Sequence, residues 1–218
     1  MGYGNLVCID SPPKGNPNTG FHSINQDAYL AFGAITSRFL KADFSCVGYS
    51  GKGVYRNFDK SEKETLPKIY SMLYPNAGLE KEYDFSFNPH LIVIKIGTND
   101  FGAEIGDFPD MTDSSRFVTT YLKFLQFVTQ KNPQAKIVLA AGGGLTDYYP
   151  QGLQRLSRYK SWVKSVLLKA EKNYSNTFGF FEFQPQSPPY GEDWHPTALS
   201  QQKFANEITP YLKEFMGW

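Results

Sequence analysis

The sequence has little of what several classes of protein require. Its 218 residues include only two cysteines, Cys8 and Cys46, and neither belongs to a C-x-x-C pair. That number excludes a disulfide scaffold and leaves the redox compartment open. No apolar run approaches the roughly 20 residues of a membrane span, and the first residues lack the basic and apolar regions of a signal peptide. We therefore expect no association with a membrane.

Strong charge of either sign is also missing. The net charge is +1 with three histidines, which provides no basic surface of the kind that nucleic acid requires. No cluster of histidine, cysteine and acidic residues has the spacing of metal ligands, so neither a metal nor a cofactor is expected. Internal repeats, low-complexity tracts and linkers are absent too. With 41% hydrophobic and 20% charged residues, we interpret residues 1–218 as one globular domain.

What the sequence does contain is an alternation of helical and strand patterns. Apolar residues recur at helical spacing in five stretches, and short β-prone or continuous apolar runs lie among them. The predicted helices cover 24–42, 64–73, 118–128, 156–170 and 204–215, and the predicted strands 44–49, 91–94, 137–141 and 178–183. This alternation predicts parallel crossover units and a three-layer αβα sandwich of the α/β class.

Polar or glycine-rich segments follow each predicted strand. They are Ser50-Gly51, Gly97 to Asp100, Gly142 to Gly144 and the loop 184–195. Open α/β sheets bind ligands at the carboxyl ends of their strands, so we expect the functional residues at this edge.

The segment Asp193-Trp194-His195-Pro196 precedes the closing helix. A carboxylate two residues before a histidine can accept a hydrogen bond from the Nδ1–H group, which leaves Nε2 to act as a general base toward a serine. Pro196 suits the first position of a helix and would hold His195 at the helix start. The alternative is that Asp193 belongs to the helix cap and His195 is an ordinary loop residue.

The segment Gly97-Thr98-Asn99-Asp100 follows a buried strand. Asn99 can direct its side-chain amide at a developing oxyanion, and the backbone N–H of Gly51 would be a second donor. A simple turn is the alternative, because glycine, asparagine and aspartate are favoured in turns.

Together these blocks resemble those of SGNH (GDSL-type) esterases in order and spacing. The resemblance narrows to family 2 carbohydrate esterases and extends over essentially the whole chain. It is carried by Gly2-Tyr3-Gly4-Asn5, Ala31 to Arg38, Ser50 to Asn57, Gly97 to Phe101 and Asp193 to Pro196. It implies a mainly parallel, flavodoxin-like sheet and an extracellular, monomeric enzyme that removes O-acetyl groups from xylan or glucomannan. Its partners would be acetylated polysaccharides or oligosaccharides.

The nucleophilic serine of these esterases lies in a G-D-S-x-T block that ends the first strand. In the family that block directly precedes Gly-Tyr-Gly-Asn, whereas this chain begins with Met1. The resemblance therefore implies that the serine and the first strand precede Met1. Ser11, which follows an apolar run and Asp10, is a possible alternative nucleophile, and Ser50 is a weaker one because it occupies the oxyanion block.

Two aromatic residues stand beside the proposed catalytic residues. Tyr55 and Trp194 could stack on a sugar face, and we predict that they bind substrate. Two other functions remain open: a catalytically inactive carbohydrate-binding relative, and an SGNH lipase or thioesterase that acts on acyl chains.

Overall fold

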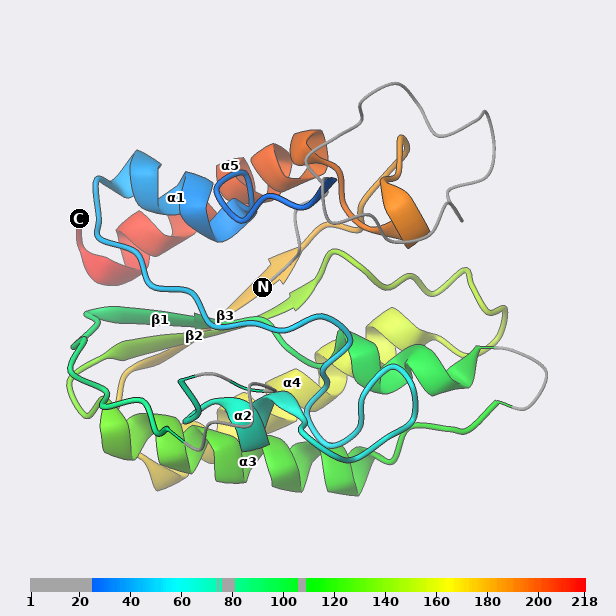
Figure 1. The fold of residues 1–218 in the computed structure, drawn as a ribbon, viewed down its shortest axis with the longest axis horizontal. Helices are drawn as coiled ribbons and strands as arrows, with labels where there is room; N and C mark the ends of the chain where they lie inside the picture. The colour runs from blue at the N-terminus through cyan, green and yellow to red at the C-terminus, as the bar shows by residue number, and fades with distance from the viewer. Residues whose placement is uncertain (1–24, 74, 76–80, 106–108) are drawn as a thin grey trace. The chain divides into compact units, whose positions relative to one another are not determined.

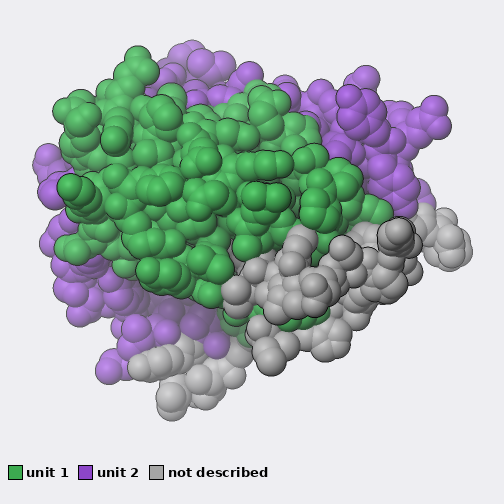
Figure 2. Space-filling model, turned by 90° about the horizontal axis from the view of Figure 1, so that it is seen from above, with its two compact units in different colours: residues 1–50, 142–145, 181–218 green, residues 51–141, 146–180 purple. Residues whose placement is uncertain are grey.

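The computed structural model describes residues 25–73, 75, 81–105 and 109–218. The chain divides into two compact units, whose atoms are green (unit 1) and purple (unit 2) in Figure 2. Unit 1 contains residues 1–50, 142–145 and 181–218, and unit 2 contains residues 51–141 and 146–180.

A three-stranded sheet runs in the order β1-β2-β3. The strands are β1 (Leu91–Ile94), β2 (Lys136–Gly142) and β3 (Phe178–Phe183). β1 and β2 are parallel, with Leu91 opposite Lys136 and Ile94 opposite Leu139. Every residue of β2 after Lys136 is buried, as expected for a central strand of a parallel sheet.

The two long helices of unit 2 are α3 (Ser114–Lys131) and α4 (Arg155–Asn173), and they lie side by side (Figure 1). Each buries one apolar stripe, because residues three and four positions apart share a face of a helix. The Asp113 side chain begins α3 by accepting a hydrogen bond from the Arg116 N–H. Tyr159 of α4 is fully buried and donates its hydroxyl hydrogen to the Ile96 carbonyl at 2.8 Å.

In unit 1 the helices α1 (Phe32–Leu40) and α5 (Ala198–Met216) pack against each other (Figure 1). The Phe183 ring lies edge-on to Phe32 at 5.1 Å and near Phe204 at 5.2 Å between ring centroids. The Gln201 side chain accepts a hydrogen bond from the Phe32 N–H at 2.9 Å, which satisfies one of the free donors at the start of α1.

Several predicted elements differ from the observed ones. The prediction of a strand at 44–49 is wrong: these residues form no strand, and Phe44 and Val47 are about half exposed. A strand needs a neighbour for its backbone hydrogen bonds, and a β-prone sequence cannot supply one. The helix predicted at 64–73 shrinks to α2 (Leu66–Ile69), with Pro67 in its first turn.

The structure confirms the α/β class with a parallel sheet. Within the described residues β1 is an edge strand that pairs only with β2. β1 is accordingly only half buried at Leu91, Ile92 and Val93, although its continuous apolar sequence is typical of a strand buried on both faces. None of the described helices is both long enough and apolar enough to cross a bilayer.

Candidate active site

The loop from Gly51 to Asn57 in unit 2 carries one of the two predicted oxyanion donors. Gly51 has φ +72°, a value that glycine adopts without strain. Gly53 is required for a different reason: a Cβ there would lie 2.5 Å from the Asp100 Oδ2 atom and would overlap the Arg56 carbonyl. The loop is held so closely that only glycine fits at this position.

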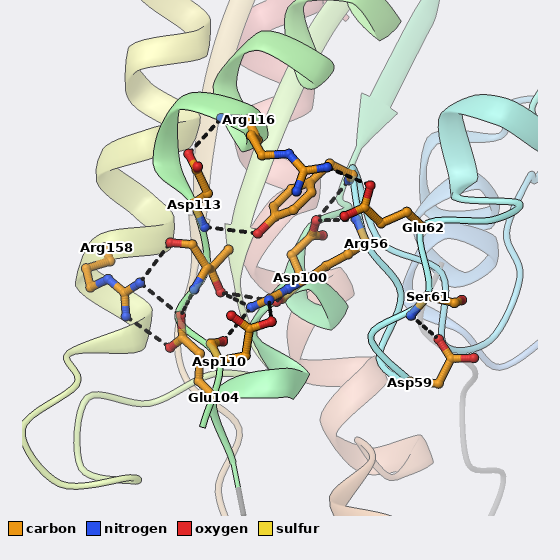
Figure 3. Close-up of polar contacts among 12 residues, drawn as sticks. Arg56, Asp59, Ser61, Glu62, Asp100, Glu104, Asp110, Asp113, Arg116 and Arg158 are labelled. Carbon is orange, nitrogen blue, oxygen red and sulfur yellow. Dashed lines mark hydrogen bonds and ion pairs between the residues drawn. The ribbon is translucent and has the colours of Figure 1, made fainter. Parts of the chain in front are cut away.

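The Asp100 carboxylate binds the backbone of this loop through three hydrogen bonds. Its Oδ2 atom accepts a hydrogen bond from Val54 N–H at 2.7 Å and Oδ1 accepts one from Tyr55 N–H at 2.9 Å. Oδ1 also lies 3.3 Å from the donating Arg56 N–H, and Asp100 and Arg56 are both drawn in Figure 3. The side chain has no exposed surface. Burial raises the pKa of Asp100 to about 6, while the three backbone donors favour the ionised form.

Arg56 ties the same loop to the segment that follows Asp100. Its Nε–H donates to the Asp100 carbonyl at 2.8 Å, and its two terminal nitrogens donate to Asp110 and Thr112 (Figure 3). The guanidinium is 4% exposed, so its five donors need partners in the protein. Asp100 is therefore bonded to the loop through its side chain and through its backbone carbonyl.

Glu104 anchors the next turn, in the 3-10 helix η2 (Thr98–Glu104). Its carboxylate accepts two hydrogen bonds from Arg158, at 2.9 and 3.0 Å, and one from the Thr112 N–H at 2.8 Å (Figure 3). Arg155 Nε lies 3.9 Å away. Burial opposes ionisation of Glu104, but the hydrogen bonds from Arg158 and Thr112 outweigh it and lower the pKa of the carboxyl.

Asn99 and Gly51, the two predicted oxyanion donors, belong to this one framework. The Asn99 side-chain amide donates to the Lys52 carbonyl at 2.9 Å, which fixes its orientation and leaves one amide hydrogen over. Among the residues that the structure describes, none accepts a hydrogen bond from the Gly51 N–H. The Gly51 N–H and one amide hydrogen of Asn99 thus remain available within the described residues. An oxyanion is bound by donors of this kind, held in fixed positions.

His195 lies in unit 1, in a loop with unusual backbone conformation. Asp193 and Trp194 both have positive φ, +47° and +62°, which is uncommon for residues other than glycine. The resulting kink turns the Glu192 carbonyl toward His195, and this oxygen lies 2.9 Å from both the backbone N–H and the ring Nδ1. Gln186 steadies the loop by donating to the Trp194 carbonyl at 2.6 Å.

The ring contact has a chemical consequence for His195. A carbonyl only accepts hydrogen bonds, so Nδ1 carries the proton and Nε2 of the neutral ring carries a lone pair. The ring is therefore oriented by a backbone atom of Glu192, whereas the sequence indicated the Asp193 carboxylate. The role of Asp193 stays a prediction. Pro196 does not occupy the first helical position, because α5 begins at Ala198 after the capping residue Thr197.

The two aromatic residues that we predicted as substrate-binding have different surroundings. Tyr55 is 6% exposed, its hydroxyl oxygen accepts a hydrogen bond from Asp113 N–H at 2.9 Å, and the Arg116 guanidinium lies 4.8 Å from its ring centroid. Trp194 is 49% exposed, with its ring 5.2 Å from that of Tyr190. Trp194 thus offers a ring to solvent, and Tyr55 offers little of one.

Ser11, the possible alternative nucleophile, lies outside the described residues. In the described part of the chain, no group of three or more histidine, cysteine or acidic side chains could hold a metal ion.

Sequence reasoning missed three buried charged residues in and behind the loop from Gly51 to Asn57: Arg56, Asp100 and Glu104. Nothing in the sequence distinguishes them from other charged residues of the same segments, such as Lys52 and Asp110. Charged residues are almost never fully buried unless they are paired, so their partners had to be found in the tertiary structure.

The chain is similar in sequence to several known proteins. The chain is 30% identical over 216 residues, 98% of its length, to the cellulase/esterase CelE of Acetivibrio thermocellus, of which it covers 25%. It is 27% identical to an acetylxylan esterase / glucomannan deacetylase of Cellvibrio japonicus, over 88% of this chain and 50% of that protein. The chain thus spans half or less of the length of these two relatives.

The chain is also similar to a solved structure. The whole chain superposes on 61% of a family two carbohydrate esterase from Clostridium thermocellum, solved in complex with cellohexaose, with a TM-score of 0.84 and 29% identity. This similarity confirms the predicted SGNH hydrolase fold. The profile of the GDSL-like lipase/acylhydrolase family matches residues 23–203. The chain therefore belongs to the GDSL-like lipase/acylhydrolase family, and its relatives named above are carbohydrate esterases.

Proposed function

We propose that this chain forms the catalytic part of an esterase that removes O-acetyl groups from plant cell-wall polysaccharides such as xylan or glucomannan. The observation that carries the proposal is the pair of oriented but unsaturated donors, Gly51 N–H and the Asn99 amide, in a family whose members hydrolyse esters. The orientation of the His195 ring by the Glu192 carbonyl supports the same reaction.

The reaction is acyl transfer through a serine. The serine hydroxyl adds to the acetyl carbonyl carbon while His195 Nε2 takes its proton. Gly51 and Asn99 stabilise the negative charge on the carbonyl oxygen. The tetrahedral intermediate then releases the sugar hydroxyl, which receives the proton from His195. Water, deprotonated by the same nitrogen, adds to the acetyl-enzyme, and collapse releases acetate and the free serine. Asp193 is proposed to support His195.

The nucleophile is proposed to lie in a segment that precedes Met1, at the end of a strand. Two observations on the described residues support this: β1 pairs there on one edge only and is half buried, and residues 44–49 have the composition of a strand but are assigned to none. Ser11 remains the alternative within this chain.

The substrate is proposed from the relatives and from the surface near His195. The Cellvibrio japonicus relative is named for acetylated xylan and glucomannan, and the Clostridium thermocellum structure contains a glucose oligomer. Trp194, next to His195, presents a half-exposed ring that can stack on a sugar face. Substrate binding by Tyr55 stays a separate proposal. An extracellular, monomeric enzyme fits such a substrate.

The test compares two forms of the protein: residues 1–218, and the same residues with a strand and a G-D-S-x-T block added before Met1. We expect the extended form to hydrolyse an aryl acetate and acetylated xylan, and the shorter form to retain only the weak acceleration of binding and oxyanion effects, about 10³–10⁴-fold over water. The measurement is kcat/KM for acetyl, butyryl and octanoyl esters.

Three outcomes would contradict the proposal in different ways. Strong activity of residues 1–218 that Ser11→Ala abolishes would place the nucleophile within this chain. Preference for the octanoyl ester would indicate a lipase or thioesterase. Binding of xylan or cellooligosaccharides without ester hydrolysis by the extended form would indicate a carbohydrate-binding protein.

A further inference from the structure

We propose that Asp100 is a positioning residue of the oxyanion hole, whose buried carboxylate holds the backbone of residues 54–56 so that the Gly51 and Asn99 donors stay aligned. The inference rests on the function proposed above and adds a residue that touches neither substrate nor nucleophile. Asp100 acts through the loop that it binds.

The first argument is the distribution of hydrogen bonds around the loop. Three consecutive amides, those of Val54, Tyr55 and Arg56, point at one carboxylate that has no contact with solvent. The flanking loop amides have partners within unit 2: Gly53 N–H donates to Asn57, Asn57 N–H to Ser61 and Phe58 N–H to Gly51. For the Gly51 N–H, by contrast, no acceptor is found in the described part of the chain.

The second argument is that Asn99 and Asp100 are consecutive residues with complementary tasks. Asn99 reaches the Lys52 carbonyl, one residue after Gly51, while Asp100 reaches the amides of residues 54–56. The two neighbouring side chains therefore bind the loop on both sides of Gly53, where no room for a Cβ exists. Any shift of Asp100 relative to the loop changes the separation of the two oxyanion donors.

The third argument concerns what a neutral side chain would do in this place. An asparagine at position 100 keeps one acceptor oxygen and turns the other into an NH₂ donor. With its oxygen toward Tyr55 and Arg56, the NH₂ group would face the Val54 N–H, which leaves two buried donors opposed. The loop must then move, and with it the Gly51 amide.

The expected kinetic signature follows from the role of the oxyanion hole. Its donors bind the transition state more strongly than the substrate, so a displaced donor lowers kcat and leaves KM nearly unchanged. A misplacement on the order of 1 Å can cost about 10²-fold. We therefore expect Asp100→Asn to lower kcat for an aryl acetate by about 10²-fold in the upstream-extended protein.

Asp147→Asn is the matched control. Asp147 belongs to the same unit and also accepts a backbone and a side-chain hydrogen bond, both from Ser157, but has no contact with residues 51–57 among the described interactions. Hydrogen exchange of backbone amides is measured on the same proteins. We expect faster exchange at residues 54–56 in Asp100→Asn alone, and a kcat near that of the unsubstituted enzyme in Asp147→Asn.

Each outcome decides the proposal. Faster exchange at 54–56 together with a selective loss of kcat supports it. Faster exchange with unchanged kcat, or equal losses of kcat in both variants, overturns it. If Asp100→Asn does not fold, hydrogen exchange of the unsubstituted protein tests the proposal instead. Slow exchange at residues 54–56 together with fast exchange at Gly51 supports the positioning role of Asp100, and rapid exchange at Val54 overturns it. Absence of esterase activity in every form refutes the proposed function itself, whatever the exchange rates show.

Discussion

The loop from Gly51 to Asn57 and the loop from Gln186 to His195 hold their functional groups by different means. Residues 53–57 are all buried; the buried Asp100 carboxylate binds their backbone, and the guanidinium of Arg56 binds the segment that contains Asp100, Asp110 and Thr112. The loop that carries His195 is largely exposed, and backbone carbonyls at a left-handed kink hold it in place. The loop from Gly51 to Asn57 therefore depends on a charged side chain that is distant in the sequence, whereas the loop that carries His195 depends on its own backbone conformation.

The largest expected effect is on the exposed loop. His195→Ala removes the only base that we propose, and general-base catalysis contributes up to about 10⁴-fold. We expect kcat of the upstream-extended protein to fall by about that factor, with little change in thermal stability because the ring is exposed. Initial rates on an aryl acetate and a melting curve measure the two effects. Wild-type rates would rule out His195 as the base.

The supports of the buried loop are expected to matter for stability. Glu104→Gln removes the charge that faces Arg158 and Arg155, and breaking a buried pair in this way costs about 3–5 kcal/mol in the free energy of unfolding. Glu62→Gln is the matched control, since Glu62 pairs with Arg116 at 2.6 Å but both side chains are half exposed. The control should lose less than about 1 kcal/mol. Equal losses in urea unfolding would show that burial does not set the strength of these pairs.

The pH dependence of stability tests the state of Asp100. Its pKa of about 6 in the folded protein lies above 3.8, so the folded state binds the proton more tightly than the unfolded state. This stabilisation is complete below about pH 4 and is lost as the pH rises through 6, a change of about 3 kcal/mol. The destabilisation by Asp100→Asn should therefore be larger at pH 3 than at pH 8.

The comparison of the two proteins isolates Asp100, because other carboxyl groups such as Glu104 titrate in both and cancel. Unfolding free energies at several pH values provide the measurement. A destabilisation that grows with pH would mean that the three backbone donors hold the carboxylate ionised and keep its pKa below that of the unfolded chain.

The smallest effect is expected at Asp193. Because the Glu192 carbonyl accepts the Nδ1 hydrogen, Asp193→Asn should lower kcat by less than about tenfold. Steady-state kinetics beside His195→Ala measures the difference. A loss of about 10⁴-fold, as expected for removal of an orienting carboxylate, would show that the carboxylate orients the base and that the carbonyl is secondary.

Much of the fold was predictable, and the failures have a common cause. The buried run Leu91 to Ile94 and the amphipathic pattern of 118–128 lead directly to β1 and α3, because burial imposes periodicity on the sequence. Residues 44–49 have an equally good strand pattern and form no strand. The difference lies in hydrogen-bonding partners, which are supplied by another part of the chain.

The site residues stay a prediction, but the structure shows how two of them are held. Asn99 and Gly51 were singled out because they follow β-prone runs and belong to recognisable blocks, and the structure adds the Lys52 contact that orients Asn99. The three hydrogen bonds that Asp100 accepts were not predicted, since its partners lie 44 to 46 residues earlier. No local pattern encodes that distance.

The sequence by itself determined the class of this protein: an α/β domain with hydrolase blocks in a recognisable order. Those conclusions depend on periodicity and on short motifs, which are local properties of the chain. Only the tertiary structure decided that Asp100 and Arg56 join the loop from Gly51 to Asn57 to the segment that follows β1, and that a carbonyl of Glu192 faces the histidine ring. These contacts depend on which buried charges find partners and where the backbone turns, and both follow from packing the whole chain.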